Sequence, residues 1–205
     1  MLDFDFMLKN WTFIAGGVGA TLGVAVVALL LAIPLALILG LGRRSTNSPI
    51  RVTSTFFVSA LDATPLYVQI LFIFLALPQL GIFLPGLLAG SLALAVNYGA
   101  RLSEVFRAGF ATAGHGQRVS WRGLGLVGFD EVIALMRDTA LIAATGFVHE
   151  IVWRAIRVGR AEFKNLEAFL IAIALYWLLL LVPAFIIRTL KNGMTTAELN
   201  LETDQ

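Results

Sequence analysis

The chain has 205 residues, of which 59% are apolar and only 14% charged, with a formal net charge of +2. Soluble domains carry about one-quarter charged residues, so this composition indicates a polytopic membrane protein that forms a single domain over residues 1–205. The absence of cysteine excludes disulfides and thiolate metal sites. No soluble basic module is expected either, which excludes nucleic-acid binding.

The first apolar segment is too long to be a signal peptide. Residues 1–11 include Asp3 and Asp5, whereas a signal peptide begins with basic residues, and the uncharged run over residues 10–42 exceeds a signal-peptide core. About 20 apolar residues are enough to cross the hydrocarbon of a bilayer. This run therefore predicts a first membrane-spanning helix that stays in the protein.

Basic residues in the loops predict how the chain is oriented in the membrane. Arg43, Arg44 and Arg51 follow the first span, whereas only Lys9 precedes it, so this loop is expected in the cytoplasm and the N-terminus outside. The basic residues after the last span place the C-terminus inside, which requires an odd number of spans. Beyond the first span, apolar runs predict four more, over residues 52–77, 86–106, 132–153 and 169–187.

Two parts of this topology depart from a simple pattern. The segment 52–77 is interrupted by Asp62, Thr64 and Pro65, and the segment 132–153 contains several charged side chains. The loop after it is expected outside although it carries four basic residues, against the positive-inside rule. The predicted fold is an all-α membrane protein of about five transmembrane helices, with the N-terminus outside and the C-terminus inside.

Three sequence patterns resemble catalytic motifs, but each lacks a required part. A segment that begins at His149 resembles the HExxH zinc motif, but Trp153 occupies the position of the second histidine. A GxGxxG pattern over residues 123–128 follows no expected strand, so it cannot build a βαβ unit. Asp62 and Asp138 lack the glycine context of an intramembrane aspartyl protease. We therefore expect no catalytic residue, no metal site and no cofactor bound by this chain.

Polar side chains recur at the expected membrane depth. Asn97, Arg101 and Glu104 share one face of the third span at helical spacing. A lone charge facing lipid costs on the order of a few kcal/mol, so this face is expected to meet protein or a water-filled path. For Gln69, Thr64 and Thr139 the competing interpretation is structural hydrogen bonding between helices. For Arg101 it is contact of the guanidinium with lipid headgroups. The predicted path residues are Asp62, Thr64, Gln69, Asn97, Tyr98, Arg101, Glu104, Asp138 and Thr139.

A resemblance to a known family is carried by three segments in order along the chain: SALDATPLYVQILFIFLALP, NYGARLSEVFRAG and IALMRDTALIAATG. They resemble the membrane subunits of ABC importers for polar amino acids, of the histidine/glutamine permease type. The resemblance implies a type I importer permease fold in the bacterial cytoplasmic membrane. It also implies a second permease subunit, two cytoplasmic ATPases that use ATP, and a periplasmic or lipid-anchored substrate-binding protein.

The resemblance further implies a contact with the ATPase through the glycine-rich, basic cytoplasmic loop over residues 108–131. The loop is short, because Leu126 and Asp130 nearly adjoin where the family has a longer amphipathic segment. The family also carries Arg-Gly-Thr-Pro in place of residues 62–65 and Glu-Ala-Ala in place of residues 119–121. The residues expected to contribute to coupling are Gly116, Arg118, Trp121, Gly123 and Gly125.

These residues support one leading hypothesis and two alternatives. In the leading one, Asp138 or Glu104 binds the ammonium group of an amino acid and Arg101 binds its carboxylate, in an alternating-access importer. At rest, Asp138 is expected to pair with Arg101. One alternative is a diverged partner of a true permease that does not couple to an ATPase, which the short loop suggests. The other is a proton-coupled secondary carrier, against which the lack of an internal repeat argues.

Overall fold

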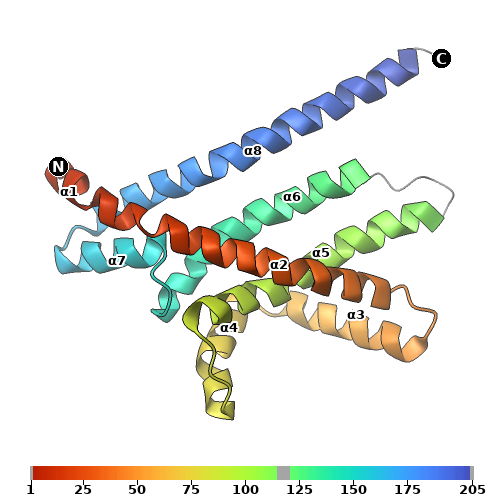
Figure 1. The fold of residues 1–205 in the computed structure, drawn as a ribbon, viewed down its shortest axis with the longest axis horizontal. Helices are drawn as coiled ribbons and strands as arrows, with labels where there is room; N and C mark the ends of the chain where they lie inside the picture. The colour runs from red at the N-terminus through yellow and green to blue at the C-terminus, as the bar shows by residue number, and fades with distance from the viewer. Residues whose placement is uncertain (1, 115–120, 204–205) are drawn as a thin grey trace.

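Every secondary-structure element in the described residues, 2–114 and 121–203, is helical (Figure 1). This computed structural model confirms the all-α expectation. α2, α5, α6 and α8 run roughly along the long axis, and α1 and α7 lie together at the end that holds the N-terminus. The helices are α1 (Phe4–Ala15), α2 (Val18–Gly42), α3 (Ser48–Ala63), α4 (Leu66–Leu71), η1 (Phe72–Ala76), η2 (Leu77–Leu80), α5 (Gly86–Gly114), α6 (Trp121–Asp138), η3 (Thr139–Thr145), α7 (Ile151–Ala161) and α8 (Asn165–Thr203).

The core lies largely between α2 and α5. Ser91 of α5 donates a hydrogen bond of 3.2 Å to the Val24 carbonyl near the start of this contact. Near its end, a Cβ atom on Gly40 would lie 3.2 Å from the Ser103 carbonyl oxygen. Small side chains let two helix backbones approach this closely. On α2 the contact is lined by buried alanines spaced by about one helical turn, Ala25, Ala28, Ala32 and Ala36.

The second expected span is broken near its middle. α3 ends at Ala63, Thr64 and Pro65 are extended, and the helical segment that starts at Leu66 is bent by 103° from α3. A proline sterically pushes the preceding residue out of the helical region, which explains the break. The segment then continues through the π-helix η1 and the 3-10 helix η2. It ends at Gly81, whose φ of 81° suits a residue without a side chain.

The fourth expected span, residues 132–153, is not one continuous helix, and whether it crosses the membrane stays a prediction. α6 ends at Asp138, the chain tightens into the 3-10 helix η3, and a new helix, α7, begins at Ile151. Gly146, with a φ of 78°, follows the end of η3, and Glu150 caps α7 with its own side chain. Polar residues that were expected inside a span therefore mark helix ends.

The loop expected over residues 108–131 is also mostly helix. α5 continues to Gly114 and α6 begins at Trp121, so only residues 115–120, which lie outside the described residues, separate them. Glycines suggested a loop, but a glycine inside a helix costs only about 1 kcal/mol relative to alanine. This cost does not prevent the two helices from extending into the segment.

By length and composition, two helices in the described residues could cross a membrane, Phe4–Gly42 and Asn165–Phe185. The number is three if the bent pair of α3 and the segment Leu66–Leu80 is one span. These segments agree with the first, second and last expected spans. The expected third and fourth spans, in α5 and α6, carry charged side chains and are not among them. The count of five spans and the outside N-terminus therefore stay predictions.

Two basic residues fix α7 and the turn that follows it to neighbouring parts of the chain. The Arg154 guanidinium donates hydrogen bonds to the carbonyl oxygens of Phe13 at 2.9 Å and His149 at 3.0 Å. The Lys164 ammonium lies 3.2 Å from the Asp3 carboxylate. Part of the positive charge that conflicts with an external position is thus matched within the protein.

Candidate functional site

Four polar side chains meet where α5 faces α6. The Tyr98 hydroxyl donates a hydrogen bond of 2.6 Å to Asp138, and Arg101 Nη2 lies 2.9 Å from Glu131 Oε2. The central carbon of the Arg101 guanidinium lies 4.8 Å from the centroid of the Tyr98 ring, within range of a cation–π contact. We refer to Tyr98, Arg101, Glu131 and Asp138 as the α5–α6 polar row.

The register of two antiparallel helices produces this row. Tyr98 and Arg101 are one turn apart on α5, and Glu131 and Asp138 are two turns apart on α6. Because the two helices run in opposite directions (Figure 1), the earlier residue of α5 meets the later residue of α6. The predicted pair between Asp138 and Arg101 is therefore wrong, since Asp138 accepts a hydrogen bond from Tyr98 and Arg101 forms an ion pair with Glu131.

The row is buried at one end and accessible at the other. The Tyr98 side chain is fully buried, while Arg101 and Glu131 keep 39% and 22% of their side-chain area exposed. Asp138 is half-buried. The row offers a carboxylate that can accept from an ammonium group and a guanidinium that can donate to a carboxylate. Among the described residues, no group of three or more His, Cys, Asp or Glu side chains could hold a metal ion.

A second group of predicted path residues fills the break between α3 and α4. Gln69 Nε2 donates to the carbonyl oxygens of Leu61 at 2.9 Å and Thr64 at 3.0 Å. Asn97 Nδ2 donates to Gln69 Oε1 at 3.3 Å, which connects the break to α5. Helix ends leave carbonyl groups without intrahelical partners, so these contacts favour the structural interpretation of Thr64 and Gln69. The neighbouring Asp62 is exposed.

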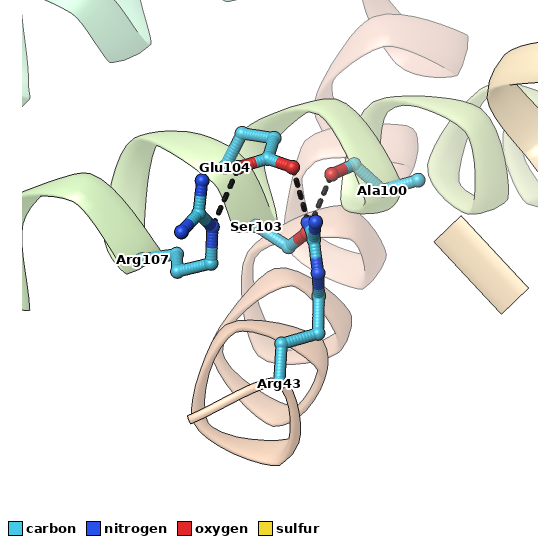
Figure 2. Close-up of polar contacts among 5 residues, drawn as sticks. All are labelled: Arg43, Ala100, Ser103, Glu104 and Arg107. Carbon is cyan, nitrogen blue, oxygen red and sulfur yellow. Dashed lines mark hydrogen bonds and ion pairs between the residues drawn. The ribbon is translucent and has the colours of Figure 1, made fainter. Parts of the chain in front are cut away.

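Glu104 pairs with two arginines, as Figure 2 shows. One carboxylate oxygen contacts Arg43 at the end of α2, and the other lies 2.8 Å from Arg107 Nε. The Arg43 side chain is only 13% exposed, whereas that of Arg107 is 46% exposed. Both oxygens of Glu104 thus have cationic partners, and the residue joins α2 to α5. It is a weaker candidate for binding an ammonium group than the half-buried aspartate of the polar row.

Thr139, the residue after Asp138, is buried and contacts α8. Its hydroxyl donates to the Met136 carbonyl at 2.7 Å and lies 3.2 Å from the Tyr176 hydroxyl. Sequence reasoning missed Tyr176 and Glu131. A tyrosine in the apolar run of α8 gives no charge signal, and the glutamate fell in the segment expected to be a loop. Only the contacts between helices identify these two residues.

The residues expected to contact an ATPase fall where α5 is joined to α6. Gly116 and Arg118 lie outside the described residues. Trp121, Gly123 and Gly125 belong to the first turns of α6. The expected contact surface therefore includes the start of a helix.

No protein-family model matches the chain. It is 29% identical over 214 residues to the arginine transport system permease protein ArtQ of Bacillus subtilis, covering 94% of this chain and 97% of that protein. It is 26% identical to the putative glutamine transport system permease protein GlnP of Rickettsia conorii, covering 93% and 98%. It is also 26% identical to the L-cystine transport system permease protein TcyB of Bacillus subtilis, covering 87% and 85%.

A solved structure has the same fold. It is described as the crystal structure of an amino acid ABC transporter with histidines, and it matches with a TM-score of 0.84 at 22% identity, over 94% of this chain and 99% of the other. The three relatives are named as permease proteins of transport systems, in agreement with a transport subunit and not an enzyme. By sequence over nearly its whole length and by fold, the chain is a homologue of the permease subunits of amino-acid ABC transport systems.

Proposed function

We propose that this chain is a permease subunit of an ATP-driven ABC importer that moves polar amino acids across the cytoplasmic membrane of a bacterium. The observation that carries the proposal is the α5–α6 polar row, which gathers carboxylates and a guanidinium around the Tyr98 ring. An amino acid carries the complementary ammonium and carboxylate groups. Relatives named for arginine, glutamine and cystine transport support a polar, zwitterionic substrate.

In the proposed mechanism the solute replaces the internal partners of the row. Its ammonium group competes with the Tyr98 hydroxyl for Asp138, and its carboxylate competes with Glu131 for Arg101. A charged donor forms a stronger hydrogen bond to a carboxylate than a neutral hydroxyl does. When the solute leaves, the internal contacts re-form: Arg101 is again paired with Glu131, and Asp138 again accepts a hydrogen bond from Tyr98.

Transport of this kind requires partner subunits. We expect a second permease subunit, identical or related, two cytoplasmic ATPases that hydrolyse ATP, and a periplasmic or lipid-anchored binding protein that delivers the solute. The segment 108–131 is proposed to face the ATPases. Closure of the ATPases would then rock the helices around the polar row and expose it to each side in turn.

The test is uptake of radiolabelled arginine and glutamine by proteoliposomes that contain the permease with its ATPases and binding protein. Asp138→Asn keeps the shape of the side chain and removes its charge. Uptake should fall by at least about tenfold, because a hydrogen bond to a charged group is lost, while the yield of assembled complex is unchanged. Asp5→Asn on the exposed side of α1 is the matched control and should transport normally.

Three other outcomes would contradict the proposal, and two of them would favour one of the alternative functions. Normal uptake by the Asp138→Asn variant would overturn the role of the polar row. Uptake that persists without ATPase subunits and follows a proton gradient would instead indicate a secondary carrier. A wild-type chain that assembles with a second permease but never engages an ATPase would indicate a non-coupling partner.

A further inference from the structure

The junction between α6 and η3 is held from two sides by tyrosines. Tyr98 of α5 bonds Asp138 at 2.6 Å, and the Tyr176 hydroxyl of α8 lies 3.2 Å from that of Thr139. At this point the chain changes from α-helix to 3-10 helix. The 3-10 helix continues α6 and ends at Gly146, and a 3-10 helix has poorer hydrogen-bond geometry than an α-helix, so we treat this junction as a candidate hinge. The two residues of this candidate hinge are thus tied to two different helices.

Tyr176 connects the junction to Glu150, a carboxylate that the proposed transport mechanism does not use. The Tyr176 hydroxyl donates to Glu150 Oε2 at 3.1 Å. A tyrosine has one hydroxyl proton, and here it goes to Glu150. The Tyr176 oxygen therefore shares the single Thr139 proton with the Met136 carbonyl oxygen, which lies closer, at 2.7 Å. The bonds therefore run in series from Thr139 through Tyr176 to Glu150.

Glu150 is buried but well supplied with donors. It is 1% exposed and caps the N-terminus of α7. Its Oε1 accepts from the Trp153 amide at 2.6 Å, and its Oε2 accepts from the Val152 amide at 2.8 Å. A carboxylate at a helix N-terminus is stabilised by such amides and by the helix dipole. Because Oε2 is shared between α7 and Tyr176, a shift of α7 lengthens or breaks the bond to the tyrosine.

α7 is itself fixed to the junction of α1 and α2. The Ile151 amide lies 3.5 Å from the Thr21 hydroxyl, which donates to the Gly17 carbonyl at 3.2 Å. A Cβ atom on Gly17 would lie only 2.5 Å from the Ile151 nitrogen, so the two backbones are in direct contact. Arg154 donates to the Phe13 carbonyl at 2.9 Å. The start of α7 and the α1–α2 junction are therefore expected to move together.

We propose that Glu150 is a positioning residue for transport, which acts through Tyr176 on Thr139. While this series of bonds is intact, Asp138 stays directed at Tyr98. When α7 shifts, the bond to Tyr176 is lost, the α6–η3 junction is free to turn, and the aspartate becomes available to a solute ammonium group. The inference rests on the proposed function, because its consequence is the availability of Asp138 to the solute.

The decisive variant is Tyr176→Phe, which removes one hydroxyl and keeps the ring. The binding of radiolabelled arginine is measured on the purified permease–ATPase complex without its binding protein. The dissociation constant should fall by about fivefold, because the variant lacks one of the hydrogen bonds that keep Asp138 bonded to Tyr98 and unavailable to the solute. Damage to packing alone would lower the yield of complex and would not tighten binding. Tyr67→Phe, 41% exposed on α4, is the matched control.

Two further variants keep the proposal testable. Thr139→Val removes the other end of the series with little change of volume and should tighten binding in the same way. Tyr98→Phe should also tighten binding, and adding Tyr176→Phe to it should have no further effect, because the aspartate is already released. If Tyr176→Phe and Thr139→Val both bind arginine like the control, while Asp138→Asn still loses uptake, the positioning role is refuted and the proposed function stands. Normal uptake by Asp138→Asn would refute the proposed function itself.

Discussion

Glu104 shows how one carboxylate can pair with two arginines that contribute differently to stability. Arg43 comes from another helix and its side chain is 13% exposed, whereas Arg107 is one turn along the same helix and 46% exposed. An exposed i,i+3 pair contributes less than about 1 kcal/mol. Loss of a partner from a more buried pair costs more, because the charge that remains is poorly solvated.

Arg43→Ala should therefore destabilise the protein more than Arg107→Ala. We expect a loss of about 1–2 kcal/mol for Arg43→Ala, limited because Glu104 is itself 41% exposed, and less than about 0.5 kcal/mol for Arg107→Ala. Thermal unfolding of the detergent-purified protein measures the difference, since 1 kcal/mol corresponds to about 2–4 °C at this chain length. Equal unfolding midpoints for the two variants would contradict the unequal contributions inferred from burial.

At the scale of elements, the sequence predicts apolar helices well and misses helix ends that depend on polar contacts. Long uncharged runs predicted the helices α2 and α8, and Pro65 indicated the break between α3 and α4. Asp138, at the end of α6, accepts from Tyr98, and Glu150, which caps α7, also accepts from Tyr176; both tyrosines belong to other helices. No local pattern within residues 132–153 contains that information.

The candidate site follows the same rule. Asp138 and Arg101 stand out in the sequence because charges in apolar runs are costly unless they face protein or water. Their partners are set by the register of α5 against α6, which hydropathy does not encode. Glu131 and Tyr176 could be identified only after the helices were placed against each other.

The contact between α1–α2 and α7 gives a prediction at the element scale. Gly17→Ala would place a Cβ atom 2.5 Å from the Ile151 nitrogen and 2.6 Å from the Glu150 carbonyl carbon, so a backbone has to move. Overpacking of this kind costs about 1–3 kcal/mol. Gly19→Ala is the matched control, because a Cβ there meets nothing within 4 Å and alanine favours the helix. The thermal midpoint should fall for the first variant and hold or rise for the second. If the thermal midpoint fell by a similar amount in both variants, the close contact between Gly17 and α7 would not explain the effect.

At the scale of the whole molecule, helix length and exposed apolar surface both suit a membrane. α8 has 39 residues, a length of about 60 Å, against about 30 Å for the hydrocarbon of a bilayer. Figure 1 shows its C-terminal part extending beyond the other helices. Large apolar side chains are exposed on α3, η1 and α8, among them Phe56, Phe72, Trp177 and Phe185. Such surfaces suit contact with lipid or with a second permease subunit.

The five-span topology predicts on which side of the membrane each connection lies. The chain has no cysteine, so a single introduced cysteine can be labelled selectively. Thr46 after α2 is expected inside, while Phe83 before α5 and Arg160 on α7 are expected outside, and all three are exposed. A membrane-impermeant maleimide should label Phe83→Cys and Arg160→Cys in intact spheroplasts, and Thr46→Cys only in inverted vesicles. The informative position is Arg160. It lies outside only if the segment of α6 and η3 crosses the bilayer despite the break at Asp138. Labelling of Arg160→Cys from the same side as Thr46→Cys would show that this segment does not cross and that the chain has four spans.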